Sequence, residues 1–210
     1  MSFDPASGVT EALKREKLIP NVIPETFIPS MLFSIIYPGG NEVILGNELS
    51  TNDTAEEPDI SFAPLSMPVE QADSEGDEVA YTLVMFDPDV PTRADPQYKT
   101  FRHWVITGLQ SPADSSAATA NSAALKIHPS VTPYRPPGPR PASGVHRYTF
   151  LLFQEPSSKP FSIPPDAPER NNDTLESRRH WNAIDFAEKY GLKLVGANFM
   201  LITAPPATEE

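Results

Sequence analysis

The abundance of proline is the feature that most constrains the fold of this 210-residue chain. There are 25 prolines, and a proline inside a helix removes a backbone hydrogen bond and clashes with the preceding turn. At the same time, 39% of the residues are hydrophobic, which is too many for a wholly disordered chain. The chain is therefore expected to fold, with its prolines in loops and at the ends of strands, and the sequence favours short strands separated by loops.

Charge and cysteine content exclude several classes of function. The chain has 16 Lys and Arg against 28 Asp and Glu, a formal charge of −12, and such a field repels nucleic acids and anionic lipid surfaces. Because there is no cysteine, thiolate catalysis, disulfides and thiolate-bound metals are excluded. The N-terminus lacks the features of a secretory signal, and no apolar run approaches the ~18 residues of a membrane span. We therefore expect a cytoplasmic protein without a transmembrane segment.

Short apolar segments with the spacing of β-strands make up the core of the sequence. In residues 31–37 the apolar side chains recur every second position, and Pro-Gly-Gly-Asn at 38–41 then predicts a turn into a strand over 42–45. This pattern indicates a mainly β protein, an antiparallel two-sheet sandwich with a few short peripheral helices. Further strands are expected over 81–86, 101–107, 146–153 and 192–202, and loops over 50–59, 68–78, 111–124 and 155–177.

Two helices are predicted, one near each end of the chain. Thr10 can cap a helix that ends at Leu18, before Pro20, and residues 181–190 have helical spacing closed by Gly191. The predicted organisation is an N-terminal helical arm over 1–26, a single domain over 27–203 and a flexible tail over 204–210. Few core positions are expected before Phe27, so whether the arm is docked or free stays open.

The segment after the apolar run at 81–86 carries charged residues between prolines. It reads Asp87-Pro88-Asp89-Val90-Pro91-Thr92-Arg93. Side chains two positions apart in an extended segment point to the same side, so both carboxylates are expected to face one site. The alternative is a turn in which Asp caps backbone amides and Arg93 forms a structural ion pair.

Two histidines lie within predicted strands. Alternation places His103 on the same face as Phe101 and Val105, and it places His146 and Tyr148 on one face with Arg147 on the other. Buried imidazoles, carboxylates and a tyrosine hydroxyl are costly unless they satisfy one another or a ligand. We therefore expect these groups to share one pocket, together with Gly138 from the Pro-rich loop at 134–141, whose amide can approach an anion closely.

Taken in order, DPDVPTR, HW, the Pro-rich loop with Gly138 and GVHRYTFLLFQ resemble the phosphatidylethanolamine-binding protein family. The resemblance implies one large and one smaller antiparallel sheet and a small pocket for phosphate-like or acetate-like groups. Arg140 departs from the family, since many members have a second proline there, and this makes the rim of the pocket more basic. The predicted ligand-binding residues are Asp87, Asp89, Pro91, His103, Gly138, Pro139, His146 and Tyr148.

Three classes of function fit these residues. The first is a non-enzymatic binding or regulatory protein that binds a phosphate or phospholipid head group. The resemblance is to the branch of the family that includes the carboxypeptidase Y inhibitor, and this branch implies a serine carboxypeptidase as partner. Animal members of the family imply a kinase as partner instead. The second is a hydrolase in which His146 and Asp87 act on a phosphoester or ester, although the chain has no G-x-S-x-G elbow. The third is a metal site of two histidines and two aspartates, against which the resemblance argues. We predict the first class, with no cofactor.

Overall fold

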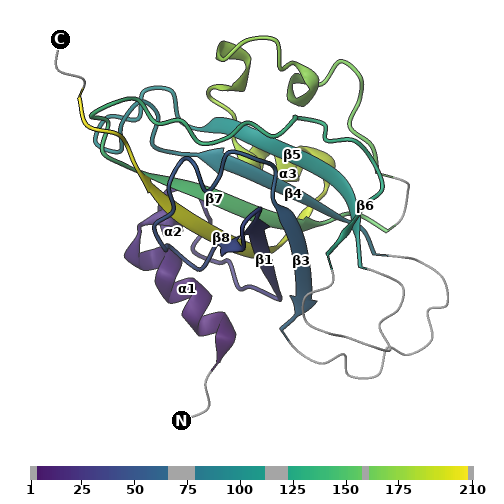
Figure 1. The fold of residues 1–210 in the computed structure, drawn as a ribbon. Coiled ribbons are helices and arrows are strands. Elements are labelled where there is room, and N and C mark those ends of the chain that lie inside the picture. The colour runs from purple at the N-terminus through teal and green to yellow at the C-terminus, as the bar shows by residue number, and fades with distance from the viewer. Residues whose placement is uncertain (1–3, 66–78, 112–122, 158–160, 208–210) are drawn as a thin grey trace.

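In the computed structural model of the protein, which describes residues 4–65, 79–111, 123–157 and 161–207, eight strands form two antiparallel sheets (Figure 1). The smaller sheet has the order β2-β1-β3, and the larger has the order β6-β5-β4-β7-β8. The predicted mainly β, two-sheet fold is confirmed. The strand bounds are β1 Met31–Tyr37, β2 Asn41–Glu42, β3 Asp59–Pro64, β4 Tyr81–Asp87, β5 Phe101–Gln110, β6 Leu125–Lys126, β7 Val145–Gln154 and β8 Lys193–Thr203.

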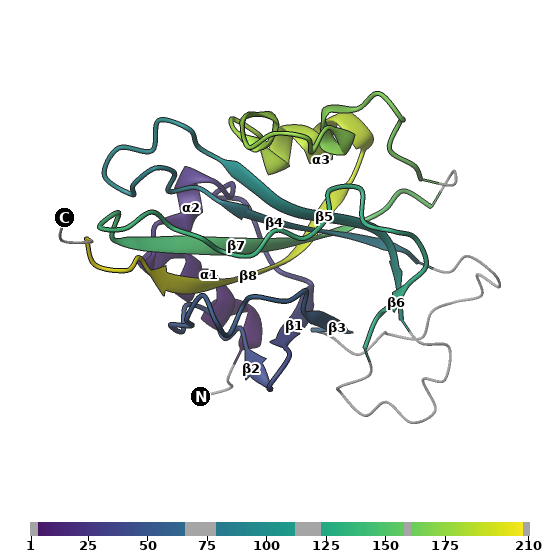
Figure 2. The ribbon, with the colours of Figure 1, turned by 45° about the horizontal axis from the view of Figure 1, so that its top comes forward.

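The large sheet is the central layer and buries apolar side chains on both faces. Consecutive residues of β7 show this, since Phe150 and Leu152 pack toward the small sheet while Leu151 and Phe153 pack toward the helices. The small sheet and α3 lie on opposite sides of the large one (Figure 2). A strand buried on both faces is apolar at nearly every position, which explains the continuous run of hydrophobic residues in β4.

The N-terminal segment belongs to the core, and here three predictions are wrong. Helix α1 spans Pro5–Arg15 and is followed by α2, Leu18–Asn21. The predicted helix end at Leu18 is wrong, because Leu18 begins α2 and Pro20 lies within it. The cap is Asp4, whose carboxylate accepts from the Ala6 amide, with Pro5 in the favourable first position; Thr10 is inside the helix. Leu13 and Leu18 are buried against the large sheet. Core positions therefore precede Phe27, contrary to the prediction, because α1 and α2 cover one face of the large sheet.

Other boundaries differ from the sequence prediction in smaller ways. Strand β3 begins inside a segment that was expected to be loop; its residue Ile60 pairs with Ile35 of β1 and is buried between the sheets. Strand β2 is shorter than the expected 42–45, because Asn47 and Asn198 side chains, and not a neighbouring strand, bond the Ile44 and Leu45 amides. The predicted loop at 68–78 and nearly all of the predicted insertion at 111–124 lie outside the described residues.

Helix α3, Ala183–Tyr190, starts at Asn182, whose side chain accepts from the Ile184 and Asp185 amides, and it ends at Gly191 in the left-handed conformation. The predicted glycine C-cap is confirmed. The preceding loop holds two short 3₁₀ helices, η2 (Pro168–Arg170) and η3 (Glu176–Arg178). Within the described part of the chain, the helices are too short and too polar for any of them to traverse a bilayer.

Candidate functional site

One pocket opens at the end of the large sheet where β4 ends and β5 and β7 begin. Its volume is about 140 Å³, below the ~300 Å³ at which pockets for drug-sized ligands begin, so it suits a small group. The structure brings seven of the eight predicted ligand-binding residues to this pocket, and their role in binding stays a prediction. These residues are Asp87, Pro91, His103, Gly138, Pro139, His146 and Tyr148.

A chain of hydrogen bonds fixes the state of the histidine at the base of the pocket. The His146 Nδ1 atom lies 2.7 Å from Asp87 Oδ2, and its Nε2 atom lies 2.9 Å from Ser143 Oγ. The Ser143 hydroxyl is itself 2.6 Å from the Arg140 carbonyl, to which it donates its only proton. Ser143 can then only accept from Nε2, while the Asp87 carboxylate accepts from Nδ1. Both ring nitrogens therefore carry protons, and His146 is an imidazolium.

The pKa direction of His146 agrees with this assignment. Burial lowers the pKa of His146, but the hydrogen bond and negative charge of Asp87 outweigh burial and leave the pKa raised above its usual 6.5. The pKa of Asp87 is itself raised above its usual range, because burial outweighs the hydrogen bond from His146, so the assignment of the proton to His146 rests on the hydrogen-bond geometry. The pair thus places a buried positive charge at the base of the pocket, held by a carboxylate behind it.

His103 is in the opposite state. Its Nδ1 atom donates to the Arg135 carbonyl at 2.7 Å, and burial lowers its pKa to about 3, so it is a neutral imidazole at physiological pH. Its ring lies 5.1 Å from that of Tyr148, and burial raises the pKa of the Tyr148 phenol. The pocket therefore contains one cationic ring, one neutral ring and a protonated hydroxyl.

A β-bulge directs His103 into the pocket. Neighbouring positions of β4, Met85 and Phe86, pair with Trp104 and Arg102, so that His103 is the extra residue between them. A bulge reverses the alternation of side chains beyond it. The prediction that His103 shares a face with Val105 is wrong for this reason, since Val105 packs among the helices on the far side of the sheet.

Asp89, the eighth predicted residue, does not reach the pocket. Its two oxygens accept from Arg147 Nη2 at 2.6 Å and Nε at 2.9 Å, and Oδ2 also accepts from the Arg147 amide. The backbone bends at this point, because the Asp89 amide donates to Asp87 Oδ1 at 2.8 Å. The prediction that both carboxylates face one side is wrong, whereas Arg147 lies on the face opposite His146, as predicted.

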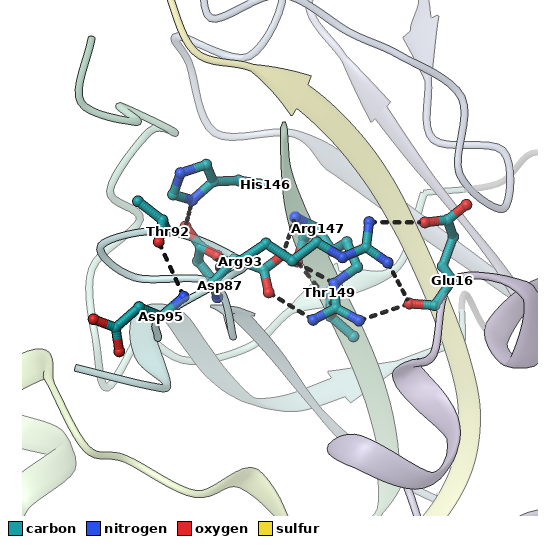
Figure 3. A network of polar contacts seen from close by, with 9 residues as sticks. Glu16, Asp87, Thr92, Arg93, Asp95, His146, Arg147 and Thr149 are labelled. Carbon is teal, nitrogen blue, oxygen red and sulfur yellow. Dashed lines mark hydrogen bonds and ion pairs between the residues drawn. The ribbon is translucent and has the colours of Figure 1, made fainter. Parts of the chain in front are cut away.

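The same network continues to the end of α1 (Figure 3). Arg147 Nη1 donates to the Glu16 carbonyl at 2.6 Å, and Arg93 Nη2 donates to the same oxygen at 2.9 Å. Arg93 Nη1 also pairs with the Glu16 carboxylate at 3.1 Å. The structural ion pair considered for Arg93 is therefore present, and the two arginines satisfy a carbonyl at the C-terminal end of the helix.

Four polar side chains of the pocket were missed or left without a role by sequence reasoning. Arg135 and Arg140 extend from the Pro-rich loop, and Tyr98 and Arg179 come from segments that no motif marks. Arg179 lies over the Tyr98 ring, with its Cζ atom 4.1 Å from the ring centroid. The only signal in the sequence was the replacement of a family proline by Arg140. The rim is thus cationic in a protein that is acidic as a whole.

The geometry also bears on hydrolysis and metal binding. Ser143, His146 and Asp87 are aligned like a Ser-His-Asp triad, but the serine proton is directed at the Arg140 carbonyl and the imidazolium has no lone pair to accept it. Among the described residues, no group of three or more His, Cys, Asp and Glu side chains is placed to hold a metal ion. In this state Ser143 has no base that could activate it for nucleophilic attack.

The fold and the pocket together define a class: a two-sheet antiparallel protein with a small pocket at one end of the larger sheet. A sequence model described as phosphatidylethanolamine-binding protein matches residues 40–199, and the chain belongs to this family. The resemblance stated from the motifs is confirmed.

The similarity to known proteins extends over nearly the whole chain. The carboxypeptidase Y inhibitor of Saccharomyces cerevisiae is 29% identical over 214 residues, covering 94% of this chain and 96% of that protein. CEN-like protein 1 of Nicotiana tabacum is 29% identical over 187 residues, covering 89% of this chain and 88% of the relative. The solved carboxypeptidase Y inhibitor, in complex with its cognate proteinase, superimposes with a TM-score of 0.76 at 25% identity, covering 97% of this chain and 98% of that one. The solved phosphatidylethanolamine-binding protein from Plasmodium vivax superimposes with a TM-score of 0.71 at 25% identity, covering 93% of this chain and 97% of that one.

Proposed function

We propose that this protein is a non-enzymatic regulator that binds a phosphate-type anion in the pocket and inhibits a serine carboxypeptidase. The observation that carries the anion site is the His146 imidazolium, which is positively charged, buried and held from behind by Asp87. An anion placed against it is attracted in a medium of low dielectric constant, where the interaction is stronger than in water. The Gly138 segment and the Tyr148 hydroxyl supply further polar groups at the same pocket.

The inhibitor role is supported by similarity along the whole chain, including the N-terminal segment, to a protein named carboxypeptidase Y inhibitor. Such transfer by similarity is weaker than an argument from the site, so it needs its own experiment. The cytoplasmic location stays a prediction.

Anion binding is tested by titrating the protein with inorganic phosphate while the histidine ring signals are followed by NMR. A bound anion stabilises the protonated ring, so the His146 pKa is expected to rise on saturation. His146→Gln removes the charge and is expected to weaken phosphate binding by about tenfold or more. Unchanged His146 signals at millimolar phosphate would refute the anion site.

Inhibition is tested with a purified serine carboxypeptidase and a chromogenic peptide substrate. Deleting residues 1–18 would remove Leu13 and Leu18 from the core, so it would confound loss of inhibition with unfolding. Deleting residues 1–3 keeps Asp4 and its cap, and this shorter deletion tests whether the extreme terminus is needed. No inhibition by the full chain at micromolar concentration would remove the inhibitor assignment and leave the anion pocket standing.

The aligned Ser143, His146 and Asp87 side chains are the observation that favours a second candidate, a hydrolase. A panel of ester and phosphoester substrates tests it with the wild-type protein, Ser143→Ala and His146→Ala. Turnover that survives purification and is lost in both variants would establish the hydrolase in place of the binding protein.

A further inference from the structure

We propose that the outer face of the small sheet, the face turned away from the large sheet, is a docking surface for a basic amphipathic helix of a partner protein. This surface shares no lining residue with the anion pocket, so the inference goes beyond the proposed function and does not depend on it. It follows from three features of the face: apolar side chains that point outward, a preformed hollow beside α1, and two carboxylates without an ion-pair partner among the described residues.

The small sheet is apolar on both of its faces. One face packs on the large sheet through Phe33 and Ile35 of β1. The alternate positions of the same strand, Leu32 and Ile36, point to the other side, and Ile44 adds to this side. Leu32 is 40% exposed and Ile44 is 60% exposed. Since an antiparallel sheet with one solvated face normally carries polar residues there, this face has the composition of a surface that a partner covers.

A hollow between the outer face and α1 has the dimensions of a short helix. Its volume is about 450 Å³, and Val9 of α1 lines it together with Leu32 and Ile44. The outward positions of β1 span ~14 Å, the length of about nine helical residues at ~1.5 Å each. The edge of β3 is less available to an added strand, because the Ile60 carbonyl there already accepts from the Ala124 amide. A helix that lies across the side chains, next to α1, therefore fits this face best.

The hollow is preformed, because a buried side chain ties its walls together. Asn198 of β8 donates to the Phe33 carbonyl at 3.3 Å and to the Val43 carbonyl at 3.0 Å. Its oxygen accepts from the Leu45 amide at 3.0 Å. All four residues line the hollow, so β1 and the segment after β2 are held in one arrangement. Walls that are fixed before binding lose less entropy when a partner arrives.

The charges on the outer face select a basic partner. The strand register places Ile36 between Glu42 of β2 and Asp59 of β3, on the same side of the sheet. Neither carboxylate forms an ion pair with a residue that the structure describes. Strands ~4.8 Å apart put about 10 Å between these two positions, so cations on either side of an apolar residue can reach both. Arg15 donates to the Leu45 carbonyl at 3.3 Å, so the α1 side of the hollow is already positive and the partner's cations are expected on the strand side.

The charge of the whole molecule argues against a second copy of the chain as the occupant. Each copy has a formal charge of −12, so two copies repel one another. A twofold contact across the outer face would also bring the Glu42 and Asp59 carboxylates of both copies together. A basic helix is attracted by the same field. Binding of such a helix in an apolar groove joins apolar anchors at helical spacing to charges on the flanks of the groove.

Fluorescence anisotropy of the full chain with three labelled peptides tests the inference. The probe is a peptide of about four helical turns with leucines at helical spacing and lysines beside them; the second peptide has glutamate for every lysine, and the third has the leucines scrambled. We expect the lysine peptide to bind about tenfold more tightly than either of the others. Ile44→Ser is expected to weaken its binding about tenfold, and the double variant Glu42→Gln/Asp59→Asn about threefold to tenfold.

The matched controls are Leu175→Ser and the double variant Asp166→Asn/Glu188→Gln, which change exposed residues of the same kinds outside the hollow. Their affinities are expected to equal that of the wild type, and circular dichroism checks that every variant is folded. Equal affinity for the lysine and glutamate peptides, no binding at about 100 μM, or wild-type affinity in Ile44→Ser would overturn the inference. A dimer in sedimentation that Ile44→Ser dissociates would overturn the partner helix in favour of a second copy.

Discussion

Replacing Asp89 by asparagine is expected to destabilise the fold far more than a conservative change in a loop normally does. The Asp89 carboxylate is fully buried, and Arg147 is only 5% exposed. Both carboxylate oxygens accept from the guanidinium, at 2.6 and 2.9 Å, and one also accepts from the Arg147 amide at 3.0 Å. Asparagine has nearly the same shape, so the change removes a charge without creating a cavity.

The expected magnitude follows from what remains after the change. An amide has one oxygen where Asp89 had two acceptors, and its NH₂ group would point at guanidinium N–H groups, so at least one hydrogen bond is lost. Arg147 is then a buried cation without a counter-charge, and breaking a buried pair in this way costs about 3–5 kcal/mol. This is a large part of the ~5–15 kcal/mol by which a domain is normally stable.

Urea denaturation at pH 7, followed by tryptophan fluorescence, measures this free energy of unfolding. The midpoint is expected to fall while the slope m stays unchanged. Asp95→Asn is the matched control, because it is the same chemical change in the same loop at an exposed side chain, and it is expected to shift the free energy by less than about 0.5 kcal/mol. A loss below about 1 kcal/mol for Asp89→Asn would refute the buried pair with Arg147.

Three further predictions concern pH, the N-terminal helix and a glycine. The raised pKa of His146 stabilises the fold fully below pH 6.5, and this stabilisation is lost as the pH rises through the raised value. The pKa of His103 is lowered to about 3, so its contribution to stability is lost as the pH falls below 6.5. Urea midpoints from pH 5 to 9 are therefore expected to peak near pH 6.5, and the alkaline decline is expected to vanish in His146→Gln. Leu13→Ala is expected to cost about 2–5 kcal/mol in the same assay, because Leu13 is fully buried under the sheet, and a loss under about 0.5 kcal/mol would mean that the helix is undocked. Gly46→Ala is expected to lower the free energy of unfolding by more than about 1 kcal/mol, since residue 46 has a φ of +101° and a Cβ there would lie 2.6 Å from the Phe199 ring; an unchanged midpoint would contradict this contact.

The sequence predicted the strands that carry strong local patterns. The continuous apolar run of β4 and the alternation of β7 are visible because burial on one or both faces of a sheet leaves a periodic trace in neighbouring residues. Strand β3 was missed, since its alternation of Asp59 and Ser61 with Ile60 and Phe62 is only four residues long and its pairing partner, β1, lies more than twenty residues away. Pairing over such a distance leaves no local signal.

The same distinction applies to the site. Motifs identified His146, Tyr148 and Asp87, because these residues lie in segments with a recognisable order. Arg179 and Tyr98 could not be found in this way, since a loop far along the chain brings one over the other.

By itself the sequence determined the family, the mainly β class and seven residues of the pocket, because each depends on local pattern or on a motif of adjacent residues. Only the tertiary structure decided that Asp89 turns away to hold Arg147 and that the N-terminal helix is part of the core. It also decided that His146 is charged while His103 is neutral. These outcomes depend on a backbone bend, on the packing of distant segments and on which buried groups become neighbours, and chain order alone does not specify any of the three.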